Sequence, residues 1–361
     1  MLLDLPTTRE EGWRWSELDR LPALAAGGRQ GGAPDPAGYL IGCGGPRLVF
    51  VDGAFDAAAS DPQDVGVGAV EAGSAHALAR LTRGAEGWTL TLGPDAAPAA
   101  TIEIVHLGTG GASHLPARIA LAAGAQASVV ETFAGAGWAN RLTAIDLARG
   151  ARLMRSIRIV ADDGYVSLRD EATLAAGASL VTIALGAGGA DARFDAHVTL
   201  AGPEAYAEVG GALLTRGRQR QEAAVVLRHA APHGQSRQTW RAVAADQAVA
   251  SLAARVEVAR DAQKTDGEQS LRGLLLKRTA TVNLKPELEI FADVVKCAHG
   301  ATVGELDAQA LFYLASRGVP PGRAEALLTH AFVAQAIDRI GEERVAEAFA
   351  ADADRWLEQA L

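Results

Sequence analysis

The sequence predicts a mainly β fold, a solenoid of the β-helix or stacked β-sandwich type, and a repeat is the first observation behind this prediction. A Leu-Ala motif with a following glycine begins at Leu121, Leu147, Leu174 and Leu200, with spacings of 26, 27 and 26 residues. A fixed period of roughly 20 to 50 residues is typical of solenoid proteins. Strand-like segments flank each motif, and no helical stretch lies inside a period. Leu227 keeps the spacing without the glycine.

The glycine of each repeat is the second observation. Gly124, Gly150 and Gly177 each stand three residues after the leucine that opens the motif. Glycine adopts backbone conformations that other residues avoid, so it suits a corner where the chain bends sharply between two strands. Aromatic residues make up only 5% of the chain and glycines number 40. We therefore expect a core of small and branched aliphatic side chains, with tight turns between short strands.

Three regions follow from the pattern. Residues 1–95 have mixed character, with helical spacing of apolar residues over 13–26 and 70–84 and a strand over 47–53. Residues 96–302 hold the repeats and are predicted to form the solenoid core. Residues 303–361 are predicted to form a small helical domain.

The helical domain has recognisable helix ends. Asp307 is a candidate N-cap and Gly318 a candidate stop signal for its first helix. A second helix carries an apolar stripe of Leu328, Phe332, Ala336 and Ile340. We expect this stripe to be buried either on the end of the solenoid or on a partner.

Composition excludes several classes of function. The chain has 34 basic and 43 acidic residues, a net charge of −9, which argues against nucleic-acid or anionic-membrane binding. The uncharged stretch 172–190 holds four glycines and overlaps the repeat, so we expect no membrane span there. Two distant cysteines and no signal-peptide pattern at the start favour a reducing, cytoplasmic location with free thiols.

Sequence motifs for common catalytic sites are missing. The chain has no G-x-x-x-x-G-K-[ST] motif, so we expect it not to hydrolyse ATP, and neither G-x-S-x-G nor H-E-x-x-H occurs. The adjacent acids Asp162 and Asp163 would point to opposite faces of a strand, and a solvated turn explains them better than a glycosidase pair.

Cys297 and His299 remain as the chemically interesting pair, in the segment DVVKCAHGATVG over 293–304. On a strand, residues two apart lie on one face, so the pair suits half of a site for a soft or borderline metal. A closed zinc or iron–sulfur site needs about four ligands, and nothing nearby supplies the rest. Structural core residues, a metal half-site and a reactive thiol all remain open on this basis.

Several segments resemble the SufB/SufD family of iron–sulfur cluster assembly proteins. The C-terminal block KPELEIFADVVKCAHGATVGELDAQALFYLASRG (285–318) looks like the family's signature, and the matching character extends through 262–280, 117–133, 47–55 and 5–18. The Cys-x-His-Gly-Ala-Thr form is similar to the SufD branch. The SufB branch carries a His-Glu variant there and a further catalytic cysteine that this chain lacks. Val294 departs from the family's usual Asp, and the N-terminal helical region is short.

The resemblance implies a right-handed parallel β-helix with helical segments at both ends, paired with a SufB-like subunit and bound to a SufC-like ATPase. His299 is implied to face a cysteine of the SufB-like partner where the transient Fe-S cluster forms, as a shared metal ligand or proton donor, with Cys297 as a secondary candidate. No cofactor is expected to bind stably to the chain alone. The contact with the ATPase is assigned to the C-terminal helical domain, specifically Leu311, Phe312, Tyr313, Arg317 and Phe332.

The expected function is that of a non-enzymatic scaffold subunit, in which ATP hydrolysis belongs to the partner ATPase. Two alternatives remain: a SufB-like paralogue in the same pathway, or a polysaccharide-active β-helix enzyme, which would need charged side chains gathered along one solenoid face. Because the last strands of a β-helix present unpaired edges, we expect a homodimer when the SufB-like partner is absent.

Overall fold

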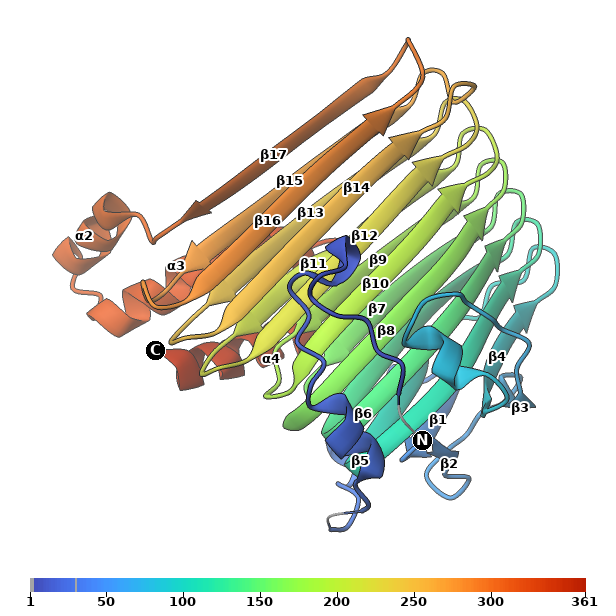
Figure 1. Ribbon diagram of the computed structural model, residues 1–361, viewed down its shortest axis with the longest axis horizontal. Helices are drawn as coiled ribbons and strands as arrows, with labels where there is room; N and C mark the ends of the chain where they lie inside the picture. Colours follow the sequence, from blue (N-terminus) through green and yellow to red (C-terminus); the bar gives the residue numbers. More distant parts are fainter. Residues whose placement is uncertain (1–2, 30) are drawn as a thin grey trace.

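The chain folds into a flattened parallel β-solenoid in which two sheets face each other (Figure 1). The computed structural model describes residues 3–29 and 31–361; residues 1, 2 and 30 of the predicted segment 1–95 lie outside the described residues. The long strands β5 (Ile102–Leu121) and β6 (Gln126–Leu147) contribute their first halves to one sheet and their second halves to the other. The predicted mainly β solenoid is thereby confirmed.

Sheet I is the name we give to the sheet that contains the first halves of β5 and β6. Its other strands are β1 (Arg47–Val51), β7 (Arg152–Ile159), β9 (Ser179–Gly186), β11 (Tyr206–Thr215), β13 (Gln235–Ala244), β15 (Asp266–Leu275) and β17 (Lys296–Gly304).

Sheet II contains the second halves of β5 and β6. Its other strands are β4 (Glu86–Leu92), β8 (Asp163–Leu174), β10 (Asp191–Leu200), β12 (Arg220–His229), β14 (Val249–Val258) and β16 (Thr281–Ile290). The short strands β2 (Ala54–Phe55) and β3 (Gly66–Ala69) pair antiparallel with β1 and β4 at the first turn.

The sequence repeat corresponds to successive turns of the solenoid as far as Leu200. Leu121, Leu147, Leu174 and Leu200 lie in register, one above the other, at the ends of their strands in sheet II. The following glycines, Gly124, Gly150 and Gly177, have φ of 71°, 70° and 65°, the left-handed region that favours glycine. Each interval therefore corresponds to one turn of the solenoid.

Leu227 keeps the sequence spacing of the repeat but not its structural register. Leu227 lies in register with Val198, and His229 takes the position below Leu200. The physical reason is a wider turn: strands β7 and β9 of sheet I have 8 residues, whereas β11 and β13 have 10. The two residues added to sheet I move the register of the next strand in sheet II.

The N-terminal helices are shorter than the apolar spacing predicts. Residues 13–26 form only the end of the 3-10 turn η1 (Glu11–Trp13) and the short helix α1 (Leu21–Ala26), and residues 70–84 form only η3 (Ala79–Thr82), while η2 covers Pro36–Gly38. Residues 13–26 and 70–84 cross the outer face of sheet II, where tertiary burial determines their conformation. Their apolar residues pack there in one cluster of Trp13, Leu18, Leu21, Leu78, Trp138 and Tyr165.

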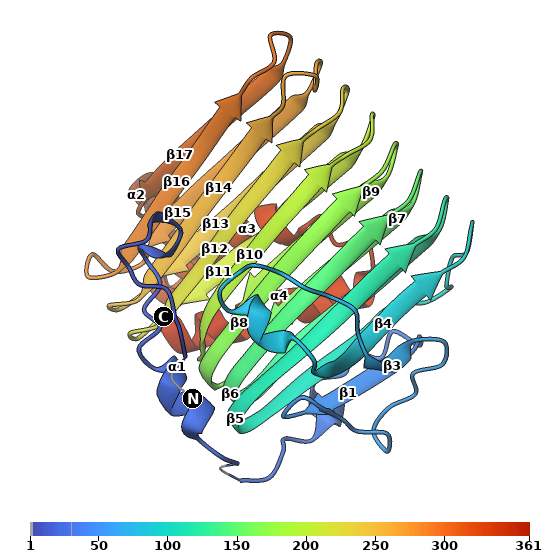
Figure 2. The same ribbon diagram turned by 45° about the vertical axis from the view of Figure 1, so that its right-hand side comes forward.

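The C-terminal helices lie along the side of the solenoid, so the expected position on its end is wrong (Figure 2). Helices α3 (Pro321–Ile337) and α4 (Glu343–Ala360) bury Val333, Phe349 and Trp356 against the outer face of sheet I. The helices pack there because outward-facing residues of sheet I below them, such as Leu185 and Val243, are apolar. Within the described residues, no helix is long and apolar enough to cross a membrane.

Helix α2 (Ala308–Ser316) buries none of its residues and projects from the end of β17 (Figure 1). Asp307 caps it as predicted, because its carboxylate accepts hydrogen bonds from the backbone N–H groups of Gln309 and Ala310. Gly318 follows with φ of 81°, as expected for a residue that ends a helix.

Candidate functional site

Strands β16 and β17 form an open end of the solenoid, opposite the end that β1 to β4 occupy (Figure 1). Strand β17 pairs in parallel with β15, and β16 pairs in parallel with β14. Among the described residues, no strand register adds a neighbour on the outer side of either one. Edge strands with free backbone groups are templates for pairing with another chain.

Cys297 lies on the inner face of β17, at the rim of the open end. It is in register with Gly267 of β15 and packs beside an apolar cluster that includes Val256, Ala262 and Ala292. Burial, reinforced by the charge of Asp266, raises the pKa of the Cys297 thiol. The sulfur is therefore protonated at neutral pH in the isolated chain and becomes a good ligand only when a metal or a partner displaces the proton.

His299 shares the inner face of β17 with Cys297, and its side chain is exposed. Its register partner is Gln269, which is 1% exposed and whose Oε1 finds no hydrogen-bond partner among the described residues. The imidazole thus stands at the rim above a buried polar side chain, free to meet a group that approaches from outside the chain.

Among the described residues, this rim holds fewer candidate ligands than a closed metal site needs. Within residues 3–29 and 31–361, no group of three or more His, Cys, Asp or Glu side chains is placed to hold a metal ion. The other thiol, Cys43, packs in the cluster between sheet I and the C-terminal helices. Burial and the carboxylates of Glu103 and Glu342 raise the pKa of Cys43 to about 12, which makes it an inert thiol.

The residues assigned to the ATPase contact fall into two environments. Phe312 and Tyr313 of α2 are 77% and 58% exposed, and the guanidinium of Arg317 lies 5.2 Å from the centre of the Tyr313 ring. Leu311 is half-buried on the same helix. Phe332 belongs to α3 and is half-buried against the sheet, with the Arg241 guanidinium 5.7 Å from its ring centre. Helix α2 therefore presents an aromatic surface, whereas Phe332 helps to hold α3 in place.

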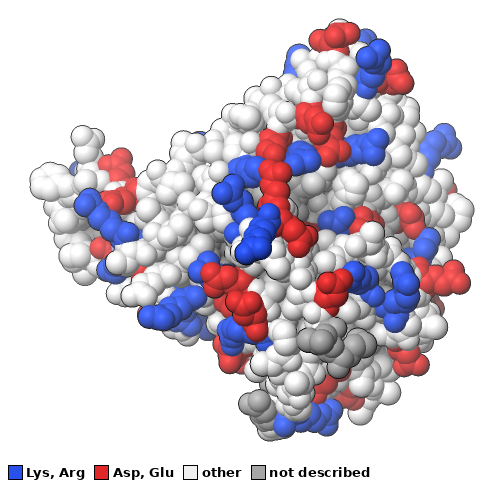
Figure 3. All heavy atoms as spheres, viewed as in Figure 1, with Lys and Arg blue, Asp and Glu red and all other residues white. Residues whose placement is uncertain are grey.

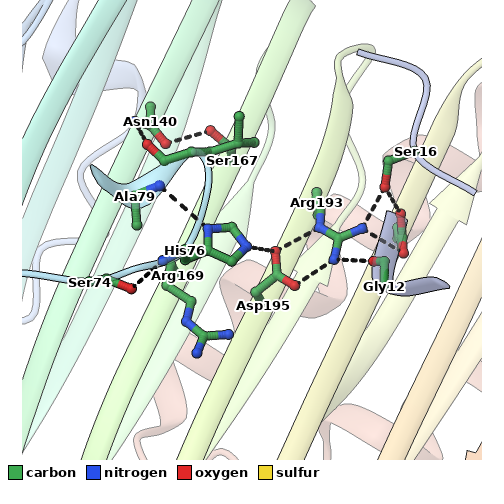
Figure 4. Close-up of polar contacts among 12 residues, drawn as sticks. Gly12, Ser16, Ser74, His76, Ala79, Asn140, Ser167, Arg169, Arg193 and Asp195 are labelled. Atoms are coloured by element: carbon green, nitrogen blue, oxygen red, sulfur yellow. Dashed lines mark hydrogen bonds and ion pairs between the residues drawn. The ribbon is translucent and has the colours of Figure 1, made fainter. Parts of the chain in front are cut away.

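A network on the outer face of sheet II is a feature that sequence reasoning missed (Figure 4). Arg193 of β10 binds Asp195 through two hydrogen bonds of 2.7 Å, and it also donates to Glu222, to the Ser16 hydroxyl and to the Gly12 carbonyl. Although burial opposes ionisation, Arg193 and His76 hold the pKa of Asp195 below its usual range. The alternation of charged residues along β10, DARFDAHVTL, was the signal for this polar face.

A second missed cluster lies inside the solenoid. Glu131 accepts hydrogen bonds of 2.7 Å from His106 and from Arg155, and Arg155 also pairs with Asp170. Burial and the charge of Arg141 lower the pKa of His106 to about 4, so this imidazole is neutral. The cluster pairs buried charges with one another, and its members come from the consecutive strands β5 to β8, whose stacking brings the side chains together.

Comparison with known proteins agrees with this geometry. Residues 106–332 match the family described as SUF system FeS cluster assembly, SufBD core domain. The chain is 28% identical over 367 aligned positions to the iron-sulfur cluster assembly protein SufD of Escherichia coli, which covers 94% of this chain and 86% of that protein. It is 29% identical to the protein of the same name from Bacillus subtilis over 40% of this chain and 33% of that one. With most of the solenoid matched, the chain belongs to the SufB/SufD family and is a SufD-like member of it.

Proposed function

We propose that this chain is a non-catalytic scaffold subunit for iron–sulfur cluster assembly. The observation that carries the proposal is the open end of the solenoid, where two edge strands meet and one of them presents Cys297 and His299 together. Three further observations support it: the family match, the small number of candidate metal ligands at the open end among the described residues, and the naming of relatives as cluster assembly proteins.

The proposed partner at this end is a SufB-like subunit. Pairing along β16 and β17 satisfies the free backbone groups of both edges and brings the partner's ligands to the rim. The iron and sulfide of the nascent cluster are cargo in this scheme, and His299 binds iron through a neutral ring nitrogen or donates a proton to the cluster. Without that partner, the same edges pair with a second copy of the chain, so the protein alone is a homodimer.

The proposed site for a SufC-like ATPase is the exposed surface of α2. Phe312 and Tyr313 supply large apolar contact area, and Arg317 adds a charge at its margin. Because aromatic and arginine side chains dominate the energetics of protein interfaces, this helix suits a docking role. Helix α2 begins four residues after β17 ends, so the two proposed sites are neighbours along the chain. Both cysteines are free thiols, in keeping with a reducing cytoplasm.

Reconstitution tests the proposal. The chain is co-purified with a SufB-like and a SufC-like protein, and cluster formation from ferrous iron and sulfide is followed by absorbance under anaerobic conditions. We expect the three proteins to form a complex, and we expect His299→Ala to abolish cluster formation while the complex and the thermal stability stay unchanged. The matched control is His233→Asn at an exposed corner, where asparagine tolerates the left-handed φ of 61°. Wild-type cluster formation in His299→Ala would remove His299 from the site.

A further inference from the structure

The N-terminal segment 3–27 runs lengthwise over the outer face of sheet II, from the first turns of the solenoid to its open end (Figures 1 and 2). Its contacts follow the strand order of sheet II. Arg20 pairs with Asp163 of β8 and with Asp191 of β10, Glu17 pairs with Arg220 of β12, and Glu11 pairs with Lys285 of β16. The segment then turns back, so that Asp4 reaches Arg80 of η3.

The segment is seated at its middle on Arg193 (Figure 4). The Arg193 guanidinium is 3% exposed and lies 3.9 Å from the centre of the Trp13 ring, which it covers. It donates to the Gly12 carbonyl at 2.9 Å and to the Ser16 hydroxyl at 2.5 Å, and Ser16 in turn donates to Glu222. A stacked, buried guanidinium with all these partners is a strong anchor, because each lost contact would leave a buried charge less satisfied.

The apex of the segment touches the edge strand. The Glu11 carboxylate lies 2.7 Å from the Lys285 ammonium, and Lys285 also approaches Glu287 at 3.2 Å. Beside this contact, Gly12, Trp15 and Arg255 help to line a hollow of about 230 Å³ between the segment and the last strands. Figure 3 shows acidic and basic side chains mixed over this face, as expected for paired charges rather than for one basic surface.

Strand β16 is the part of sheet II that most needs such support. Its pairing is with β14 on one side only, and Pro286 within it has no N–H to donate. All of its residues are half-buried or exposed, so packing fixes it less firmly than the inner strands.

We propose that segment 3–27 is a strut that positions β16 for pairing with the second scaffold subunit. Trp13 and Ser16 hold the strut on Arg193, and the ion pair of Glu11 with Lys285 connects it to β16 at the open end. The role in pairing rests on the proposed function, whereas the support of β16 is a property of the chain alone. The strut is therefore a positioning element for the interface and has no part in the chemistry of Cys297 and His299.

Amide hydrogen exchange of the isolated chain tests the support directly. We expect Trp13→Ala to raise the exchange rates of β16 amides about tenfold, and Glu11→Gln to raise them about twofold, since an exposed ion pair contributes little by itself. Amides of β17, in the other sheet, are expected to keep their rates. The matched control is Arg20→Gln, which breaks the ion pairs with Asp163 and Asp191 far from β16 and leaves the Glu11–Lys285 pair intact.

Affinity for the SufB-like partner tests the positioning. We expect its dissociation constant to rise about tenfold with Trp13→Ala, while affinity for the ATPase stays unchanged. If Trp13→Ala fails to fold, Glu11→Lys is compared with Glu11→Lys/Lys285→Glu. The swapped pair is expected to restore both readouts in part, because a glutamate at position 285 also faces Glu287.

If the exchange rates of β16 amides stay unchanged in these variants, segment 3–27 does not support β16. If the rates rise but the affinity for the SufB-like partner stays unchanged, the segment supports β16 without positioning it for pairing. If the wild-type chain binds no SufB-like protein, the proposed function and the role in positioning both fail, while the exchange experiment still decides whether the strut supports β16.

Discussion

Cys297 lies in register with Gly267, and its sulfur is 3.5 Å from the point that a Cβ on Gly267 would occupy. The same point is 3.4 Å from Ser236 Oγ and from Val256 Cγ1, which are ordinary contact distances. The missing side chain of Gly267 therefore leaves room for a methyl group directly against the thiol.

Gly267→Ala is predicted to cover the thiol of Cys297 without disturbing the fold. The new methyl group fits at contact distance, and alanine costs less conformational entropy than glycine, so the free energy of unfolding should rise by about 0.5 kcal/mol. Alkylation of Cys297 by iodoacetamide in the Cys43→Ala background should slow about threefold. A faster reaction, or a loss of stability, would contradict the packing described for this rim.

Acidification is predicted to destabilise the chain between pH 6.5 and 4, because buried histidines must stay neutral. Burial lowers the pKa of His106, His114 and His229 to about 4 from an unfolded value of 6.5. The positive charge of Arg141 adds to this effect at His106 and His114. The unfolded state binds more protons in this window, so stability falls as pH falls. Each histidine contributes about 1.5 kcal/mol of loss between pH 6.5 and 5.

Urea unfolding at pH 7, 6 and 5 measures this loss. His229→Gln keeps a donor for the Ser236 hydroxyl, which His229 Nε2 meets at 2.8 Å, and should remove about a third of the pH dependence. Glu131 acts in a separate window: although burial opposes it, Arg155 lowers its pKa to about 2, so its contribution is lost only as pH falls from 4.5 toward 2. A stability that is flat from pH 7 to 5 would contradict the buried, neutral histidines.

Phe312 and Phe332 are predicted to respond differently to truncation. Phe312→Ser changes an exposed side chain of a helix without buried residues, so the melting temperature should stay within about 1 °C while ATPase affinity falls at least tenfold. Phe332→Ala removes packing against the sheet, so the free energy of unfolding should fall by about 2 kcal/mol. Calorimetry measures the stability of each variant, and titration with the ATPase measures its affinity. Equal effects of the two changes on stability would argue against an exposed α2.

Asp352→Ala is predicted to release α4 from sheet I. Asp352 is 2% exposed and pairs with the largely buried Arg158 of β7, with a second contact from Arg355 of its own helix at 3.0 Å. Removing the carboxylate leaves a buried guanidinium without its counter-charge, at a cost of about 3 kcal/mol or more. Urea unfolding measures the loss, and Arg355→Ala, which removes only an exposed partner, is the control with a change below about 1 kcal/mol.

The period of the repeat was predictable over its first three corners, where Gly124, Gly150 and Gly177 take the left-handed φ, although Glu204 takes it after Leu200. It failed at Leu227 because a longer strand in one sheet shifts the register in the other, and no local signal marks that change. The shared face of Cys297 and His299 followed from the alternation of a strand. The helical spacing of 13–26 misled, because apolar residues at those intervals also suit an irregular segment that lies across a sheet.

The sequence by itself determined the solenoid, its corners, the capped helix α2 and the strand that bears Cys297 and His299, because each depends on residues close together along the chain. Tertiary structure alone decided that the C-terminal helices cover sheet I and that segment 3–27 crosses sheet II on Arg193. It also decided that Glu131, Arg155 and Asp170 meet in the interior. These arrangements depend on which buried faces and charges meet in space, and that is a balance of burial and pairing over the whole molecule.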